Sequence, residues 1–162
     1  MQQSDIRAWQ RLRRRMGCRF AATPEELCGR ADVDYLDVCT LPAYRLQAVE
    51  LGAQHRKHVL VQKPMAVDLP TARRMIEVAR SAGIRLGVVS QHRFDDSVLF
   101  LKEALLEGRL GKILQADAYV NWYRTAEYYA RPVKGSWAVE GGGALINQAI
   151  HRPTCYFTWL GP

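Results

Sequence analysis

Short apolar runs alternate with longer amphipathic stretches over the first 90 residues of the chain. Three of the apolar runs have the length and the β-branched content of buried strands, and they cover residues 33–40, 58–62 and 84–90. The stretches between them, 43–57 and 69–82, have helical periodicity. This β-α-β-α-β order predicts an α/β fold with a parallel sheet and right-handed crossovers.

Capping residues mark where two of the helices begin. Asp68 precedes and Gly83 follows the stretch at 69–82, and these residue types are start and stop signals for a helix. Thr23 and Pro24 predict the N-cap and first turn of a short helix further upstream. Nearer the start, four apolar residues recur at helical spacing and predict an amphipathic helix: Ile6, Trp9, Leu12 and Met16.

The pattern changes beyond residue 92. Residues 95–107 are predicted to be helical, and Gly108 and Gly111 mark a turn. The segment at 112–123 alternates apolar and polar residues, which predicts the first strand of a second sheet. One face of that strand is strongly apolar, so we expect its unpaired edges to drive self-association.

The formal net charge of +7 is typical of proteins that bind anions, nucleic acids among them. Five arginines gather near the start of the chain: Arg7, Arg11, Arg13, Arg14 and Arg15. They lie mostly on the solvated face of the predicted helix, and the sequence has no recognition-helix motif and no interleaving of aromatic with basic residues. We therefore expect no nucleic-acid partner. An anionic cofactor or sugar nucleotide would also use positive charge.

The composition is that of an ordinary soluble protein, with 48% hydrophobic and 24% charged residues. No apolar run approaches the roughly 20 residues that a membrane helix needs, so we expect no membrane partner. The arginine-rich start has no secretory signal. The four cysteines lack metal-ligand spacing, which predicts reduced thiols, a cytoplasmic location and no metal site: Cys18, Cys28, Cys39 and Cys155.

Lys63 and Pro64 follow the apolar run at 58–62, where a buried strand meets its C-terminal turn. Ligands bind at this edge of an open α/β sheet. A proline fixes φ, so the turn can hold the lysine ammonium in one direction. The ends of the other two strands, 40–42 and 90–93, meet at the same edge. The alternative interpretation is an ordinary loop with a solvated lysine.

A glycine run followed by an apolar segment forms a second candidate, from Glu140 to His151. Glycines 141–143 expose backbone N–H groups and allow another segment to approach closely. In the helix predicted after them, Asn147 and His151 are four residues apart and point the same way. An imidazole beside an amide, brought against Lys63, suits proton transfer to or from a hydroxyl. The alternative is a helix packed on glycines, with the histidine bonded to backbone.

Three segments resemble, in this order, the glucose-fructose oxidoreductase and inositol dehydrogenase family (Gfo/Idh/MocA): Lys63-Pro64, Asn121-Trp122-Tyr123-Arg124, and the run from Trp137 to His151. The resemblance implies a nicotinamide-binding Rossmann domain followed by an α+β domain with a mostly antiparallel sheet. It also implies a homo-oligomeric oxidoreductase that uses NAD or NADP. The implied substrate is a carbohydrate-like small molecule, whose reacting group is a hydroxyl of a sugar, sugar nucleotide or cyclitol.

The resemblance also implies residue roles. Lys63 and His151 take the catalytic positions, and Asn147 orients the substrate beside them. Residues at the strand ends are implied to bind the cofactor: Thr40, Leu41, Pro42, Gln62, Lys63, Pro64 and Gln91. The implied substrate-binding residues are Arg93, Arg124, Tyr128 and Asn147. Domain packing is the alternative role for Tyr128 and for its neighbour Tyr129.

The chain departs from the family pattern in several places. The Gly-x-Gly-x-x-Gly turn that seats the dinucleotide pyrophosphate is absent, so we expect weak dinucleotide binding at best. Gln62 replaces the usual glutamate, and Pro153 is expected to break the last helix. The resemblance therefore assigns 1–91 to the C-terminal part of a Rossmann domain and 92–162 to the beginning of the second domain. The alternative function is a truncated, inactive relative that serves as a binding or assembly module, or a gene fragment.

Overall fold

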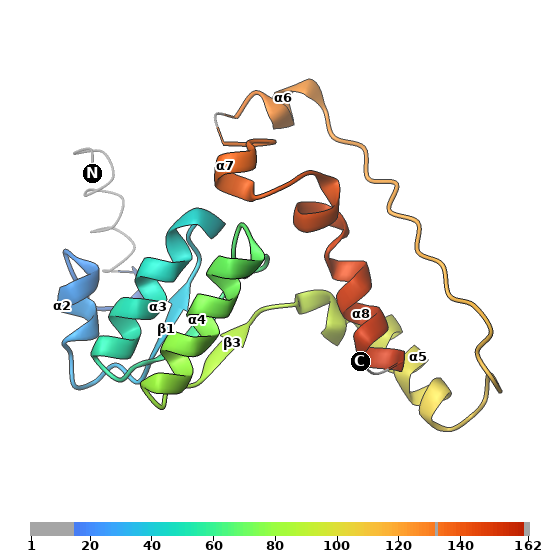
Figure 1. The fold of residues 1–162 in the computed structure, drawn as a ribbon, viewed down its shortest axis with the longest axis horizontal. Helices are drawn as coiled ribbons and strands as arrows, with labels where there is room; N and C mark the ends of the chain where they lie inside the picture. The colour runs from blue at the N-terminus through green and yellow to red at the C-terminus, as the bar shows by residue number, and fades with distance from the viewer. Residues whose placement is uncertain (1–14, 132, 161–162) are drawn as a thin grey trace.

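The computed structural model describes residues 15–131 and 133–160 (Figure 1). Three strands form a parallel sheet in the order β1-β2-β3: β1 (Tyr35–Val38), β2 (His58–Val61) and β3 (Leu86–Val88). Val59 in the central strand pairs with Leu36 on one side and Leu86 on the other. The predicted parallel α/β sheet is confirmed, and each strand is shorter than the apolar run that predicted it.

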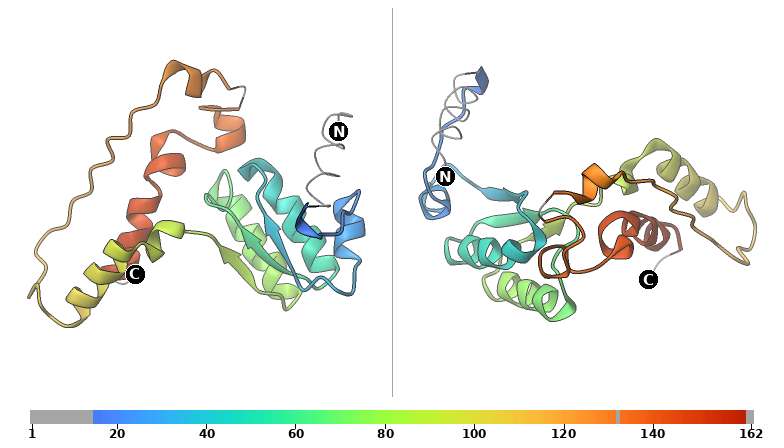
Figure 2. Two further views of the ribbon diagram at one scale, coloured as in Figure 1. Left: turned by 180° about the vertical axis from the view of Figure 1, so that it is seen from behind. Right: turned by 90° about the horizontal axis from the view of Figure 1, so that it is seen from above.

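Two helices make the crossovers between the strands: α3 (Arg45–Gln54), entered through the 3-10 turn η1 (Pro42–Tyr44), and α4 (Leu69–Ser81). They pack against each other and lie on the same side of the sheet, as the view from above in Figure 2 shows. The short helix α2 (Pro24–Cys28) packs against α3. Helices predicted at 43–57 and 69–82 are thus confirmed, the first with a 3-10 start.

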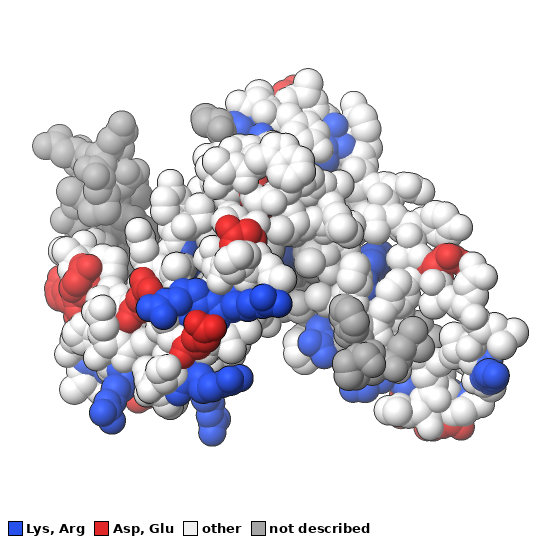
Figure 3. All heavy atoms as spheres, in the orientation of Figure 1, with Lys and Arg blue, Asp and Glu red and all other residues white. Residues whose placement is uncertain are grey.

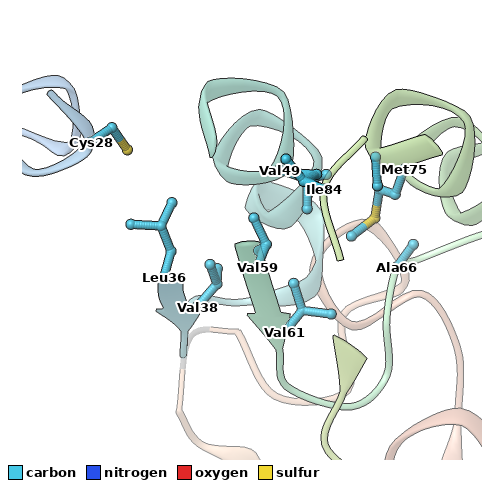
Figure 4. Packing of buried hydrophobic residues seen from close by; sticks show 10 residues of the cluster. Cys28, Leu36, Val38, Val49, Val59, Val61, Ala66, Met75 and Ile84 are labelled. Atoms are coloured by element: carbon cyan, nitrogen blue, oxygen red, sulfur yellow. The ribbon is translucent and has the colours of Figure 1, made fainter. Parts of the chain in front are cut away.

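The core lies between the sheet and these two helices (Figure 4). Val61 of β2, Val49 of α3 and Met75 of α4 are fully buried in it. Gly52 lets α3 approach β2 closely, because a Cβ at this position would lie 2.7 Å from Cγ2 of Val59. This close packing holds the last turn of α3 against the beginning of β2.

The predicted caps of the helices are confirmed. Thr23 Oγ1 accepts a hydrogen bond from the Glu26 N–H at 3.1 Å, and Asp68 Oδ1 accepts one from the Thr71 N–H at 2.7 Å. Gly83 has φ of +67° just after α4, a conformation that glycine adopts without steric cost. The amphipathic helix predicted around residues 6–16 lies almost entirely outside the described residues.

Beyond β3, helical segments dominate. They are the 3-10 turn η2 (Gln91–Phe94), α5 (Asp96–Leu106), α6 (Ala126–Tyr129), α7 (Trp137–Glu140), the π-helix η3 (Leu145–Ala149) and α8 (His151–Leu160). Helix α8 packs against α5 and η2, and Trp159 Nε1 donates a hydrogen bond to the Val98 carbonyl at 3.1 Å. The helix predicted at 95–107 is confirmed as α5. This packing places the start of α8 beside the turn that follows β3.

The helical stretch after the glycines is interrupted at Ile150, between η3 and α8, so the break lies before Pro153 and not at it. Helix α8 begins at His151 and runs through Pro153, its third residue. The N–H groups in the first turn of a helix have no intrahelical partner, so a proline there removes no hydrogen bond. Proline therefore fits within the first turn of α8.

The predicted strand at 112–123 is also wrong. Residues 113–124, the extended arm, run without strand pairing to any described residue, and near their end Trp122 and Arg124 contact the rest of the chain (Figure 1). Leu114 is 87% exposed and Tyr123 is 85% exposed. A strand needs a neighbouring strand to bond its backbone, and alternation of apolar and polar residues supplies only the two faces. The antiparallel second sheet is accordingly not observed in the described part of the chain.

Positive and negative side chains interleave over α3 and α4 on the face seen in Figure 3. Arg74, for example, lies 3.6 Å from Glu50. Within residues 15–131 and 133–160, no helix is long and apolar enough to cross a membrane. The same residues contain no cluster of three or more His, Cys, Asp or Glu side chains that could hold a metal ion.

Candidate active site

Arg45, the first residue of α3, ties the carboxyl ends of β1 and β2 together. Its guanidinium is buried and donates to the Thr40 carbonyl from Nε at 3.0 Å and from Nη2 at 2.7 Å. Nη1 donates to the carbonyls of Gln62 and Pro64, on either side of Lys63. Burial lowers the pKa of Arg45 from its usual value. The backbone around Lys63 is therefore held from both sides.

Lys63 points toward the second half of the chain. Its Nζ donates to the Asn147 carbonyl at 2.5 Å, which joins residues 84 positions apart in the sequence. The Lys63-Pro64 peptide bond is cis. Partial burial lowers the pKa of Lys63, and the positive charges of Lys134 and Arg45 add to this effect. The alternative of a solvated loop lysine does not describe this side chain.

Gly141 brings the glycine run directly onto the loop that follows Lys63-Pro64. It has φ of +79°, and a Cβ at this position would lie 2.5 Å from the Val67 carbonyl oxygen. Only glycine combines that conformation with that close approach. The sequence predicted close approach for these glycines, and at Gly141 the partner is backbone of the same chain.

Glu140, the last residue of α7, is the most heavily bonded acid of the site. Its Oε1 accepts from Lys134 Nζ at 2.6 Å and from Asn147 Nδ2 at 2.6 Å, and its Oε2 accepts from the Gly135 N–H at 2.9 Å. Burial acts to raise the pKa of Glu140, but the hydrogen bonds from Lys134, Gly135 and Asn147 outweigh it and lower the pKa. Glu140 is therefore an ionised carboxylate that fixes the Asn147 side chain.

His151 opens α8 and is 5% exposed. Its Nδ1 is buried and has no hydrogen-bond partner among the described residues. Burial lowers the pKa of His151 to about 4, and the positive charge of Lys63 adds to the shift. A neutral imidazole in this position can accept a proton at neutral pH.

His92 of η2 packs its ring against His151. The two ring centroids are 4.4 Å apart, with an angle of 84° between the planes. His92 Nδ1 lies 2.6 Å from Oδ2 of Asp95, and the Cys155 thiol lies 3.7 Å from the His92 carbonyl. His92 was not predicted as a site residue, although the 90–93 turn was predicted to end a strand. The position of His92 just after the third apolar run could have indicated its place at the site.

Arg124 and Tyr128, two of the residues implied by the resemblance to bind substrate, lie beside Asn147. Arg124 Nη2 donates to Gln148 Oε1 at 3.1 Å, and Gln148 Nε2 donates to the Tyr128 hydroxyl at 2.8 Å. The Arg124 guanidinium lies 5.4 Å from the centre of the Tyr128 ring. Together with Asn147 these residues line a cavity of about 170 Å³. Arg93 does not line it and is exposed in η2.

The candidate cofactor residues lie at the carboxyl ends of the three strands. Thr40, Leu41 and Pro42 lead from β1 into η1, and Gln62 to Pro64 follow β2. Gln91 opens η2. It lies two residues after Val89, whose N–H donates to the Val61 carbonyl. These positions suit the nicotinamide end of a dinucleotide. The chain offers no Gly-x-Gly-x-x-Gly turn for the pyrophosphate, so the residues fit the group only at one end.

A family model described as "Oxidoreductase family, NAD-binding Rossmann fold" (GFO_IDH_MocA) matches residues 2–90. The chain is 31% identical over 131 residues to the 1,5-anhydro-D-fructose reductase of Ensifer adhaerens, a match that covers 78% of the chain and 38% of that protein. It is 35% identical over 89 residues to the myo-inositol 2-dehydrogenase of Thermotoga maritima, which covers 55% of the chain and 27% of that protein.

Among solved structures, the WlbA dehydrogenase from Bordetella pertussis in complex with NADH and UDP-GlcNAcA superposes with a TM-score of 0.85. The two sequences are 31% identical, and the match covers 97% of the chain and 45% of that structure. The WlbA dehydrogenase from Chromobacterium violaceum superposes with a TM-score of 0.84 at 30% identity, and the match covers 94% of the chain and 44% of that structure. The chain thus spans less than half the length of each of these proteins.

Proposed function

Because the chain belongs to the Gfo/Idh/MocA oxidoreductase family, we propose that it carries the catalytic face of an NAD(P)-dependent oxidoreductase. The proposed reaction is the oxidation or reduction of a hydroxyl on a sugar, sugar nucleotide or cyclitol. One observation carries the proposal: the hydrogen bond from Lys63 to the Asn147 carbonyl, which joins two motifs 84 positions apart in the sequence.

Each group has a role that its surroundings support. The Lys63 ammonium, directed by the Arg45-held turn, donates to the oxygen of the reacting hydroxyl and polarises it. His151, which is neutral at pH 7, accepts the hydroxyl proton during oxidation and returns it during reduction. A bound nicotinamide supplies or takes up the hydride. Arg124 beside Asn147 holds other hydroxyl or anionic groups of the substrate.

The substrate class follows the names of the relatives. They include a reductase of an anhydrosugar, a dehydrogenase of a cyclitol and a structure that holds NADH with a sugar nucleotide. We propose a substrate from this range and a homo-oligomeric assembly in the cytoplasm. Residues 1–91 and 92–162 are proposed as parts of the nucleotide-binding and substrate domains, respectively.

Turnover with and without Lys63 tests this function. Purified chain is incubated with NAD⁺ or NADP⁺ at millimolar concentration, to offset weak pyrophosphate binding, and with a panel of sugars, sugar nucleotides and cyclitols. Absorbance at ~340 nm reports the reduced nicotinamide.

We expect Lys63→Met to lower turnover by at least about 100-fold, since general acid–base groups contribute that much. The control, Lys112→Met, changes an exposed lysine after α5 and is expected to retain wild-type turnover. Equal turnover in the Lys63 variant would overturn the proposal.

The second candidate function is a binding or assembly module without catalysis. The extended arm favours it, because its exposed apolar side chains lie without a described partner strand. Absence of turnover with every substrate, together with concentration-dependent self-association, would support this alternative.

A further inference from the structure

Glu140 accepts a hydrogen bond from the Asn147 side chain, and the mechanism above gives it no role. It is 6% exposed, so its carboxylate is largely withdrawn from water. Two of its three hydrogen-bond donors, Lys134 Nζ and Asn147 Nδ2, converge on Oε1 at 2.6 Å each. Lys134 supplies the balancing positive charge at this site.

An ionised carboxylate only accepts hydrogen bonds, so the Asn147 atom that faces it is the amide nitrogen. The amide oxygen therefore points in another direction. None of the described residues donates to Oδ1 of Asn147. Among the same residues, His151 Nδ1 is the buried side-chain nitrogen or oxygen that lacks a partner, so the Asn147 oxygen is within reach of solvent or a ligand. Asn147 also lines the cavity that holds Arg124.

We propose that Glu140 is a positioning residue that orients the Asn147 amide, so that Oδ1 faces the substrate and accepts a hydrogen bond from a substrate hydroxyl. The inference rests on the proposed function for the identity of that ligand. The same residue also presents its backbone carbonyl to Lys63. The carbonyl that binds Lys63 and the side-chain oxygen proposed to bind a substrate hydroxyl therefore belong to the same residue.

The arrangement also explains why position 147 carries an amide in this chain. An aspartate there would place a second carboxylate against Glu140, where like charges repel and one group would have to take up a proton. With a glutamine at position 140, an aspartate at 147 would be tolerated, because the glutamine amide could donate a hydrogen bond to it. The two positions are therefore expected to be energetically coupled.

Nuclear magnetic resonance of the side-chain amides tests the orientation without any turnover. The chain contains two asparagines, Asn121 and Asn147, so labelling with ¹⁵N-asparagine gives two side-chain NH₂ pairs. Asn121 is exposed in the extended arm and serves as the internal control. We expect one Asn147 amide proton to exchange with solvent at least about 10-fold more slowly than those of Asn121, and Glu140→Ala to abolish the difference. Equal exchange in the wild-type chain would overturn the proposal, whether or not Glu140→Ala folds.

A double-mutant cycle tests the coupling. Asn147→Asp is expected to lower the melting temperature by several degrees, and adding Glu140→Gln to that variant is expected to restore most of the loss. In an active preparation, Glu140→Ala should raise KM more than it lowers kcat, since it loosens a substrate acceptor and leaves Lys63 and His151 in place. Additive changes in melting temperature would overturn the pairing of positions 140 and 147. Absence of turnover in the wild-type chain would instead count against the proposed function.

Discussion

His151 is held as a neutral imidazole by the groups around it. Burial is the largest cause of its low pKa, followed by the charges of Lys63, His92 and Arg152, whereas Asp95 acts in the opposite direction. These groups come from the β2 turn, from η2 and from α8 itself. His151 is therefore unprotonated near pH 7, the form in which a ring nitrogen can accept a proton.

This state makes folding stability depend on pH. The pKa of His151 is about 4 in the folded chain against 6.5 for a free histidine, so between these values the unfolded chain binds more protons. Stability is expected to fall as the pH drops from 6.5 toward 4, by about 1–3 kcal/mol from this group. Urea unfolding at several pH values measures the loss.

The variants His151→Gln and His55→Gln separate this effect from the general acid response. His55→Gln, which replaces an exposed histidine at the end of α3, is the control for removing a histidine elsewhere in the chain. His151→Gln should flatten the slope between pH 6.5 and 4, because glutamine does not titrate. Identical slopes in all three chains would show that His151 is not held neutral by the fold.

At the level of the elements, the site depends on one backbone contact between α7 and the loop after β2. Gly141 caps α7 in the left-handed region and touches Val67, three residues beyond Pro64. Gly143, two residues later, has open space around it. The two glycines therefore differ in their structural requirement although they stand in one run.

Alanine substitution distinguishes these two glycines. Gly141→Ala should lower the free energy of unfolding by at least about 1–2 kcal/mol, because a Cβ is disfavoured at φ of +79° and collides with Val67. It should also lower turnover, since Asn147 and Lys63 would separate. Gly143→Ala is expected to cost less than about 1 kcal/mol, because it meets nothing within 4 Å. Equal losses in chemical denaturation would mean that the Val67 contact does not hold the elements together.

The helices and strands that depend on neighbouring residues could be predicted from the sequence. Asp68 and Thr23 cap helices through hydrogen bonds to residues three positions away, and each strand lies within an apolar run. Lys63 was recognisable because a strand end and a proline mark it. Arg45 and Glu140 were not singled out, because their partners lie at Gln62, Pro64 and Asn147, and only the assembled fold brings these together. Alternation at 112–123 indicated two faces but not a neighbouring strand, which explains the wrong prediction there.

The whole molecule combines a three-stranded sheet, a helical segment and the extended arm, whose last residue Arg124 bonds Gln148 of the helical segment (Figure 1). Among the residues that the structure describes, β1 and β3 are the edges of the sheet, and neither pairs with a further strand. The extended arm presents Leu114, Tyr119 and Tyr123, each more than 80% exposed. Exposed apolar surface next to unpaired backbone is a template for association between copies.

We expect the purified chain to self-associate through this arm. Light scattering over a range of concentrations should give an average mass that rises with concentration. The double variant Leu114→Lys/Tyr123→Lys should lower that mass, because two charges on the apolar side chains disfavour pairing of arms. Leu106→Lys, which changes a residue 76% exposed on α5, provides a control with the same chemistry away from the arm and should behave as the wild type does. A monomer at every concentration, or equal effects of the arm and control variants, would exclude the arm as the association surface, whereas the expected result would identify it as the site where copies of this chain meet.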